Sequence, residues 1–484
     1  MKKQCFNPYL PSYEYIPDGE PYVFDGRVYV YGSHDRFGAM SFCENDYVTW
    51  SAPEEDLSDW RYEGIIFHRT DDPMNEDGKA PLFAPDVQKG TDGKYYLYYA
   101  PAGLNVIGVA CSEKPAGLYS FCGHVKYSDN TLLGQKKEHG IVFDPGVFLD
   151  DDGQVYLYYG FTPLGVDLKG VQTGSFVVKL EGDMYTMKED PVPVEICGCA
   201  DRGHSFFEAS SMRKINGKYY FIYSSLNSHE LCYAIGKNSM GPFEYGGALH
   251  SNGDIGYQGR KEENRTCYTG NNHGSLVCIK GRWYIFGHRM TNYTAFSRQG
   301  VAEAVRILPD GSIPQIEMTS CGLNNGPLDG KGEYEARIAC NLWSKAGARH
   351  YVGGSTGAEA EELRRDHPVF TQDGEDREEC PNQHIANMHD GATAGFKYFS
   401  MPEKVTICIV TRGADGKMEV RTEPDGDVQA QILLKSGMQW QESEKVPLKI
   451  PGEKQTLYFT YCGEGVIDFM KFKLEWTGKS FFGL

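Results

Sequence analysis

A short pattern of polar and hydrophobic positions recurs five times in the first three hundred residues of this chain. Each copy begins with a turn that ends in glycine, and a run of alternating aromatic and aliphatic residues follows. Such a turn supplies the positive φ of a tight connection, and the alternation is typical of a strand with one buried face. Each copy therefore predicts a β-hairpin. The copies begin at residues 24, 91, 151, 215 and 279 and read FDGRVYVYGS, TDGKYYLYYA, DDGQVYLYYG, INGKYYFIYS and IKGRWYIFGH.

The spacing of these hairpins predicts the architecture. The turn glycines are separated by 67, 60, 64 and 64 residues, which indicates a structural repeat. About sixty residues hold four short antiparallel strands, and one such sheet cannot bury both of its faces alone. Five sheets stacked around a common axis bury these faces against one another. We therefore predict an all-β fold in which residues 1–320 form a five-bladed β-propeller.

The pattern changes after the fifth hairpin, which predicts a second domain. A segment rich in Gly, Asn and Asp, residues 321–332, is interpreted as a linker. Residues 333–484 contain several strand-like runs, such as KVTICIVTRG and KQTLYFTYCG, and no sustained helical periodicity. We predict that this second domain is a β-sandwich.

Charge and cysteine usage narrow the class of partner. The chain has 48 Lys and Arg against 66 Asp and Glu, so its net charge of −18 disfavours nucleic acid and anionic membrane surfaces. A neutral substrate is the easier fit. No apolar run of membrane-spanning length is present, and the 14 cysteines show no disulfide-framework spacing. We therefore expect a cytoplasmic location. The oligomeric state is left open.

One polar residue precedes each turn glycine by seven to nine positions. Because the innermost strand of a propeller blade begins near the axis, we expect these five side chains to converge at one mouth of the channel. Carboxyl groups that share such a cavity cannot all ionise, so one can donate a proton while another accepts one. Cleavage of a glycosidic bond needs this division of roles. The five residues are Asp18, Asp86, Asp144, Glu208 and His273.

Ordered motifs in all five repeats resemble glycoside hydrolase family 43 over residues 5–318. They are NPYLP with PDGEP, FAPDV, FDPGVFLDDDG, FFEASSMRKINGKYY, and NNHGSLV followed by GHR. The resemblance implies that Asp18 is the general base, that Glu208 is the general acid and that Asp144 modulates the pKa of the acid. It also implies an inverting enzyme that removes β-D-xylose or α-L-arabinofuranose from oligosaccharides derived from plant cell walls.

The resemblance extends to further residues of the pocket. Arg289, in the GHR motif, resembles a sugar-contacting arginine, and His273 resembles an axial histidine that faces a channel-bound ion or water. Asp86 either contacts sugar or holds the second blade, and His34 is a candidate for the pocket lining. Glu20 competes with Asp18 for the role of base, because the family often has Asp-Pro where this chain has Asp-Gly-Glu-Pro.

The second domain is similar to carbohydrate-binding module family 6 through the stretches EYEAR, DGATAGFKYF and GVIDFMKFKLEW. The resemblance implies a structural calcium held by Glu335 and Asp468, although Arg337 stands where a second acid is common. No cofactor is expected to be required for catalysis.

Two other functions fit the same pattern. One is a non-catalytic sugar-binding propeller, and the other is an endo-acting arabinan hydrolase of the same fold. A retaining fructosidase of five-bladed type is disfavoured because its Asn-Asp-Pro motif is missing. The sequence does not distinguish between the two pentoses.

Overall fold

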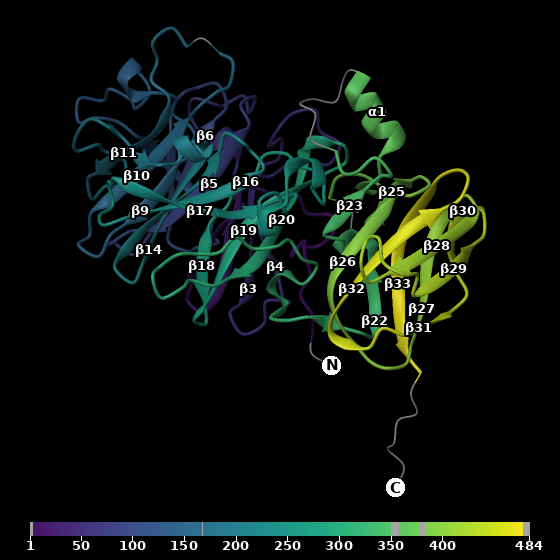
Figure 1. Cartoon of the computed structure of the whole chain (residues 1–484). Helices are drawn as coiled ribbons and strands as arrows, with labels where there is room; N and C mark the ends of the chain where they lie inside the picture. The colour runs from purple at the N-terminus through teal and green to yellow at the C-terminus, as the bar shows by residue number, and fades with distance from the viewer. Residues whose placement is uncertain (1–2, 167, 350–357, 378–382, 478–484) are drawn as a thin grey trace.

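A computed structural model describes residues 3–166, 168–349, 358–377 and 383–477. Two β-rich parts lie side by side, the first drawn in purple to teal and the second in green to yellow (Figure 1).

The first part contains five antiparallel sheets, and together these are the blades of the propeller. The first blade contains β1 (Glu20–Phe24), β2 (Arg27–Tyr31), β3 (Tyr47–Pro53) and β4 (Arg61–Phe67). The second contains β5 (Leu82–Lys89), β6 (Tyr95–Pro101), β7 (Gly108–Ser112) and β8 (Ser120–His124). The third contains β9 (Gly146–Leu149), β10 (Val155–Phe161), β11 (Gly174–Leu180) and β12 (Val192–Pro193).

The last two blades differ from this four-stranded plan. The fourth adds a short parallel strand at its outer edge and contains β13 (Ile196–Cys197), β14 (Phe206–Ile215), β15 (Lys218–Ser225), β16 (Glu230–Gly236) and β17 (Phe243–Ser251). The fifth has three strands, β18 (Leu276–Ile279), β19 (Arg282–Thr291) and β20 (Thr294–Val305). All five predicted hairpins are present, at β1–β2, β5–β6, β9–β10, β14–β15 and β18–β19.

The ring closes where the first and fifth blades meet. Strand β1 contacts both β5 and β18, and a parallel bridge joins Gly19 to Gly274. A Cβ atom on Gly274 would lie 2.0 Å from the carbonyl oxygen of Phe286, so only glycine allows this close backbone approach. The core between blades consists largely of buried tyrosines and aliphatic residues of the hairpin strands.

The second part consists of two sheets that pack face to face. One contains β21 (Leu328–Asp329), β23 (Asn341–Trp343), β26 (Thr393–Met401), β28 (Gly416–Arg421), β29 (Ala430–Leu434) and β32 (Gly452–Cys462). The other contains β22 (Gly332–Glu335), β24 (Val369–Gln372), β25 (Gln383–Met388), β27 (Val405–Gly413), β30 (Gly437–Glu442), β31 (Val446–Leu448) and β33 (Ile467–Trp476).

Helical elements are few in the part of the chain that the structure describes. The α-helix is α1 (Ala358–Asp366). Single-turn 3-10 helices are η1 (Arg69–Asp71), η2 (Lys137–His139), η3 (Ala200–Arg202), η4 (Tyr257–Gly259), η5 (Glu262–Asn264), η6 (Gly322–Asn324) and η7 (Ala336–Ile338). No helix among the described residues is long and apolar enough to cross a membrane. The predicted all-β architecture, a propeller followed by a sandwich, is confirmed.

The two domains share backbone hydrogen bonds and one apolar core. Leu342 N–H donates to the carbonyl oxygen of Thr266 at 2.9 Å, and Asn292 N–H donates to that of Phe370 at 2.9 Å. Met290 of β19 is buried in the same cluster as the sandwich residues. The segment 321–332, predicted as a linker, contains η6 and β21, and β21 pairs in parallel with β26.

Candidate active site

A pocket of about 350 Å³ opens where the innermost strands of the five blades begin. This volume is within the usual range for a small-molecule site. Every blade contributes to its wall. The lining consists of Asp18, Phe42, Cys43, Phe83, Phe143, Asp144, Phe161, Phe207, Glu208, Ser228, Asn271, His273, Ala295 and Arg298. Four of the five predicted converging groups are therefore brought together, namely Asp18, Asp144, Glu208 and His273.

Unusual backbone conformations occur where the inner strands start. Asp18 has φ 58° and Asp144 has φ 46°, both in the left-handed region that Asp tolerates better than most residues. Ala209, next to Glu208, has φ 69°, and the pairing of β14 with β15 shifts register on both sides of Glu208. Such bulges re-aim side chains near functional sites. The strand starts therefore present the three carboxyl groups to the pocket.

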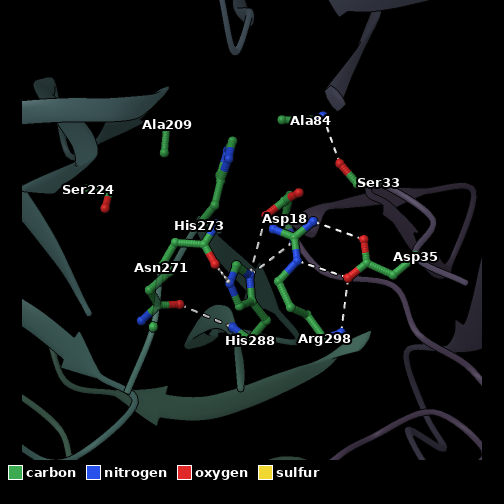
Figure 2. Close-up of polar contacts among 12 residues, drawn as sticks. Asp18, Ser33, Asp35, Ala84, Ala209, Ser224, Asn271, His273, His288 and Arg298 are labelled. Atoms are coloured by element: carbon green, nitrogen blue, oxygen red, sulfur yellow. Dashed lines mark hydrogen bonds and ion pairs between the residues drawn. The ribbon is translucent and has the colours of Figure 1, made fainter. Parts of the chain in front are cut away.

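Asp18 is a buried carboxylate held by a cation. Arg298 Nη1 donates to Asp18 Oδ1 at 3.0 Å, and Figure 2 shows the guanidinium between Asp18 and Asp35. Burial alone would raise the pKa of Asp18, but the surrounding groups, with Arg298 the strongest of them, together outweigh burial and hold the pKa below its ordinary value. Asp18 N–H also donates to His288 Nδ1 at 3.3 Å. Burial lowers the pKa of His288 to about 3, so this imidazole is neutral and can accept that bond.

Asp144 lies beside an imidazolium. His273 Nδ1 is 3.4 Å from Asp144 Oδ2, and the backbone N–H of Ala209 donates to the same oxygen at 3.2 Å. Burial would lower the pKa of His273, but the neighbouring Asp144 carboxylate raises it to about 9. Burial raises the pKa of Asp144, and the contact with His273 opposes this rise. At neutral pH this pair therefore places a positive charge next to the carboxylates.

The pKa of Glu208 is shifted in the opposite direction from that of Asp18. Burial raises its pKa well above the ordinary value, and the nearby Asp144 carboxylate raises it further. Its surroundings therefore favour the protonated form of Glu208, whereas those of Asp18 favour the ionised form. A proton donor and a proton acceptor consequently share one pocket, which is the arrangement required for general acid and general base catalysis.

Asp86 and Glu20 lie deeper than the pocket, among buried polar groups. Asp86 accepts hydrogen bonds from Tyr22 Oη at 2.7 Å and from the backbone N–H of Val147 in β9 at 2.7 Å. Of the two predicted roles for Asp86, the structure therefore favours holding the second blade. Burial and the charge of Glu20 raise the pKa of Asp86 to about 7.

Glu20 is bound to a guanidinium. Arg213 Nη2 donates to Glu20 Oε2 at 2.7 Å, and Ser211 Oγ donates to the same oxygen at 3.2 Å. Glu20 is not among the residues that line the pocket, whereas Asp18 is. The structure therefore favours Asp18 over Glu20 as the group that can meet a water molecule.

Two predicted pocket residues have other contacts. Arg289 donates to the carbonyl oxygen of Ala339 in the second domain at 3.1 Å and to Gln299 Oε1 at 3.0 Å, and it packs over the ring of Phe370. The prediction that Arg289 contacts sugar is therefore corrected, because its guanidinium is engaged at the domain interface and does not line the pocket.

His34 is likewise corrected as a pocket residue. His34 Nδ1 donates to the carbonyl oxygen of Asp46 at 2.7 Å, and Nε2 lies 3.0 Å from Glu14 Oε1. Both ring nitrogens are therefore used inside the protein. The arginine that does reach the pocket, Arg298 in β20, was not found from the sequence. Its only signal there is a polar run, Ser-Arg-Gln, in the middle of a strand that is otherwise largely apolar.

The residues predicted to hold calcium do not fit that ion. Glu335 pairs with Arg337. Asp468 accepts a bond from Arg412 Nε at 2.8 Å and another from the backbone N–H of Asn387 at 3.1 Å. Calcium requires several free oxygen ligands, and here the carboxylates already neutralise guanidinium groups.

Among the described residues, one other cluster has metal-ligand character, formed by His204, Glu230 and Cys232. His204 Nδ1 lies 2.5 Å from Glu230 Oε1, which also accepts bonds from Ser225 and Asn227. Burial opposes ionisation of Glu230, but these hydrogen bonds outweigh it and lower its pKa to about 2. The carboxylate of Glu230 is therefore already satisfied by contacts with protein groups.

An aromatic wall surrounds the carboxyl groups. Neighbouring rings of this wall lie with centroids 5.5 Å apart for Phe83 and Phe143, 5.2 Å for Phe143 and Phe161, and 5.1 Å for Phe161 and Phe207. Such rings pack against the C–H faces of a sugar and exclude water from the site. The low dielectric that they create strengthens the charge interactions within the pocket.

The chain matches a known protein family and is similar to bacterial relatives. The family Glycosyl hydrolases family 43 matches residues 17–313. A xylosidase/arabinosidase of Thermoclostridium stercorarium is 50% identical over 482 residues, covering 98% of this chain and 99% of the relative. A β-xylosidase of Xylanibacter ruminicola is 34% identical over 319 residues, covering 58% of this chain and 88% of the relative.

Solved structures share the fold. A family 43 arabinoxylan arabinofuranohydrolase from Bacillus subtilis, in complex with cellotetraose, covers 97% of each chain with a TM-score of 0.50 and 20% identity. A family 43 enzyme from Xanthomonas citri covers 63% of this chain and 92% of that chain, with a TM-score of 0.51 and 24% identity. The similarity to the Bacillus subtilis enzyme includes both domains of this chain. The similarity to the Xanthomonas citri enzyme covers a smaller part of it.

Proposed function

Because this chain belongs to the glycosyl hydrolases of family 43, we propose that it removes single pentose units, β-D-xylose or α-L-arabinofuranose, from oligosaccharides derived from plant cell walls. The observation that carries the proposal is the pair of opposite titrations within one pocket, a lowered pKa at Asp18 and a raised pKa at Glu208. The full-length similarity to a protein named xylosidase/arabinosidase supports the choice of sugar.

The proposed mechanism is a single displacement with inversion. The Asp18 carboxylate removes a proton from water as the water attacks the anomeric carbon, and the Glu208 carboxyl protonates the departing glycosidic oxygen. Asp144 keeps Glu208 protonated through its charge, and His273 balances the charge of Asp144. The phenylalanine wall holds the sugar rings and shields these proton transfers from bulk water.

The direct test is the anomer that forms first. Proton NMR of wild-type enzyme with a xylo-oligosaccharide and with an arabino-oligosaccharide is expected to show the inverted monosaccharide before mutarotation. Release of short oligosaccharides would instead identify an endo-acting arabinan hydrolase. Binding without cleavage of any substrate would identify a sugar-binding propeller.

Variants of the two carboxyl groups test their roles. In Glu208→Ala, cleavage of natural linkages is expected to fall by about two to four orders of magnitude, whereas 4-nitrophenyl glycosides, whose leaving group needs little protonation, keep most of their rate. Asp18→Ala is the matched comparison, and it is expected to reduce cleavage of both substrate types. Equal losses on both substrates in Glu208→Ala would remove Glu208 from the role of acid.

We further propose that the enzyme acts in the cytoplasm on imported oligosaccharides. In support, twelve cysteines within the described residues, those other than Cys5, are free thiols, as expected in a reducing compartment. The net charge of −18 disfavours nucleic acid and anionic lipid as partners. Fractionation of the producing cells, with activity assayed in cytoplasm and medium, tests this location.

A further inference from the structure

A loop of the first blade connects the active site with the second domain. This loop, residues 33–45, lies between β2 and β3 and carries Phe42 and Cys43 into the pocket wall. It also carries Asp35, whose carboxylate accepts bonds from Arg298 Nε at 2.9 Å and Nη2 at 3.0 Å. The backbone N–H of Arg298 donates to Asp35 as well, at 2.9 Å. Asp35 therefore sets the orientation of the guanidinium that contacts Asp18 (Figure 2).

Both halves of the 33–45 loop are bound by one carboxylate of the sandwich. Asp376 Oδ1 accepts a bond from the backbone N–H of Phe37 at 2.7 Å, and its Oδ2 accepts one from Asn45 Nδ2 at 3.1 Å. Asn45 Nδ2 also donates to the carbonyl oxygen of Asp35 at 3.1 Å. Hydrogen bonds that involve a charged group are about twice as strong as neutral ones. A continuous series of polar contacts thus runs from Asp376 through the loop to Arg298.

The residue after Asp376 supplies a second, independent connection. Arg377 Nη1 lies 2.7 and 2.9 Å from the two carboxylate oxygens of Glu14, whose side chain is fully buried. Glu14 Oε2 also accepts a bond from Trp50 Nε1 in β3 at 2.7 Å. A buried carboxylate without a partner is strongly destabilising. The second domain therefore supplies the countercharge for an acid inside the propeller, at the base of the same loop.

We propose that Asp376 of the sandwich domain is a positioning residue for the catalytic base, acting on Asp18 through the 33–45 loop, Asp35 and Arg298. The sandwich domain is on this account a structural part of the active site, separate from any sugar that it binds. The proposal rests on the proposed function only in its kinetic readout, because that readout measures pentoside hydrolysis.

The test compares two acids of the same sandwich segment in the full-length protein. Asp376→Ala removes the contact with the propeller. Asp373→Ala is the matched control, since Asp373 is bound by Arg412 Nη1 and Nη2, both at 2.9 Å, within its own domain. Hydrogen–deuterium exchange of peptides from residues 33–45 reports the loop directly, and the amides of Phe37 and Cys43 are the informative sites. The pH profile of kcat/KM on a 4-nitrophenyl pentoside reports the base.

In Asp376→Ala we expect faster exchange at Phe37 and Cys43, an acidic limb displaced to higher pH, and kcat/KM lower by about one to two orders of magnitude. Asp373→Ala is expected to match the wild type in both measurements. Unchanged exchange in the 33–45 loop would overturn the proposal whatever the activity. Faster exchange with a wild-type pH profile would also overturn it, because the loop would then not transmit to Asp18.

A failure of the proposed function has a different signature. If the wild-type protein hydrolyses no pentoside, the pH profile of kcat/KM is measured on a glycoside that it does cleave. The hydrogen–deuterium exchange of the 33–45 loop needs no substrate and tests the proposal as before. A purely structural role for Asp376 would lower the thermal midpoint and kcat together without displacing the acidic limb, and that outcome too would contradict the proposal. Asp376→Asn, which keeps the shape but not the charge, should give an intermediate displacement.

Discussion

Replacement of Arg298 by methionine is the most informative single change in this molecule. Arg298 is 2% exposed and makes side-chain hydrogen bonds of 2.9 to 3.0 Å with the carboxylates of Asp18 and Asp35. Methionine fills a similar volume without charge, so Arg298→Met removes the cation and leaves both carboxylates buried. Asp18 then loses the strongest of the interactions that lower its pKa, while burial, which raises the pKa, remains.

The magnitude follows from the geometry. Two opposite charges about 4 Å apart interact by about 4 kcal/mol at an effective dielectric constant near 20. Removal of one partner of a buried ion pair costs about 3–5 kcal/mol of folding free energy, because the other charge stays buried without compensation. Since two carboxylates lose their partner here, we expect Arg298→Met to lie at the upper end of this range.

The sign of the pH dependence can be stated for both proteins. In the wild type, the folded pKa of Asp18 is below its unfolded value, so its stabilising contribution is present above the unfolded pKa and is lost as pH falls. In Arg298→Met the folded pKa of Asp18 is higher than in the wild type, so the stability penalty of the variant develops as pH increases. The difference in unfolding free energy between the two proteins should therefore shrink toward acidic pH.

Urea denaturation at pH 4.5 and pH 8, with the acidic limb of the kcat/KM profile, measures both effects. We expect the acidic limb of Arg298→Met at higher pH than that of the wild type. Arg298→Lys keeps the charge but loses the planar fork, and it should recover part of the stability and of the profile. A loss below about 1 kcal/mol at pH 8, with an unchanged acidic limb, would refute the reasoning about the buried cation.

Two further predictions concern the acid and the ring closure. Asp144→Asn removes a charge that raises the pKa of Glu208, so the basic limb of the kcat/KM profile should move to lower pH; a limb that stays in place or moves upward would show that Asp144 does not control Glu208. Gly274→Ala places a Cβ atom 2.0 Å from the carbonyl oxygen of Phe286, where the first and fifth blades meet, and should lower the free energy of unfolding by about 1–3 kcal/mol. Thermal or urea denaturation checks this value, with Gly182→Ala as a comparison at a turn glycine whose added Cβ would meet no neighbour.

The architecture could be predicted from the sequence because local sequence patterns determine it. Alternation of period two and a glycine at each tight turn are set by neighbouring residues, so the five hairpins and the start of each inner strand could be predicted. Family membership and the enzyme class are confirmed by the match over residues 17–313 and by the full-length relative. The three carboxyl groups follow from the same counting, since each lies at the start of an inner strand.

The features of the site that could not be predicted from the sequence depend on β-bulges and on contacts between distant segments. Counting back from the turn glycine aligns Asp86 with Asp18, but the register of β5 shifts between Phe83 and Asp86, and the residue with positive φ in β5 is Ala84. Asp86 therefore lies two positions further along the strand, deeper in the channel. Arg298 reaches Asp18 across 280 residues of chain, and nothing in its local pattern specifies that contact.

Glu20, Asp86 and Ser211 are buried and do not line the pocket, and Arg213 is bonded to Glu20, so packed polar side chains close the pocket on this side. A sugar that enters the mouth therefore has to depart by the route through which it came. The freed monosaccharide blocks the next chain end until it diffuses away, so accumulated pentose should slow turnover as a competitive inhibitor.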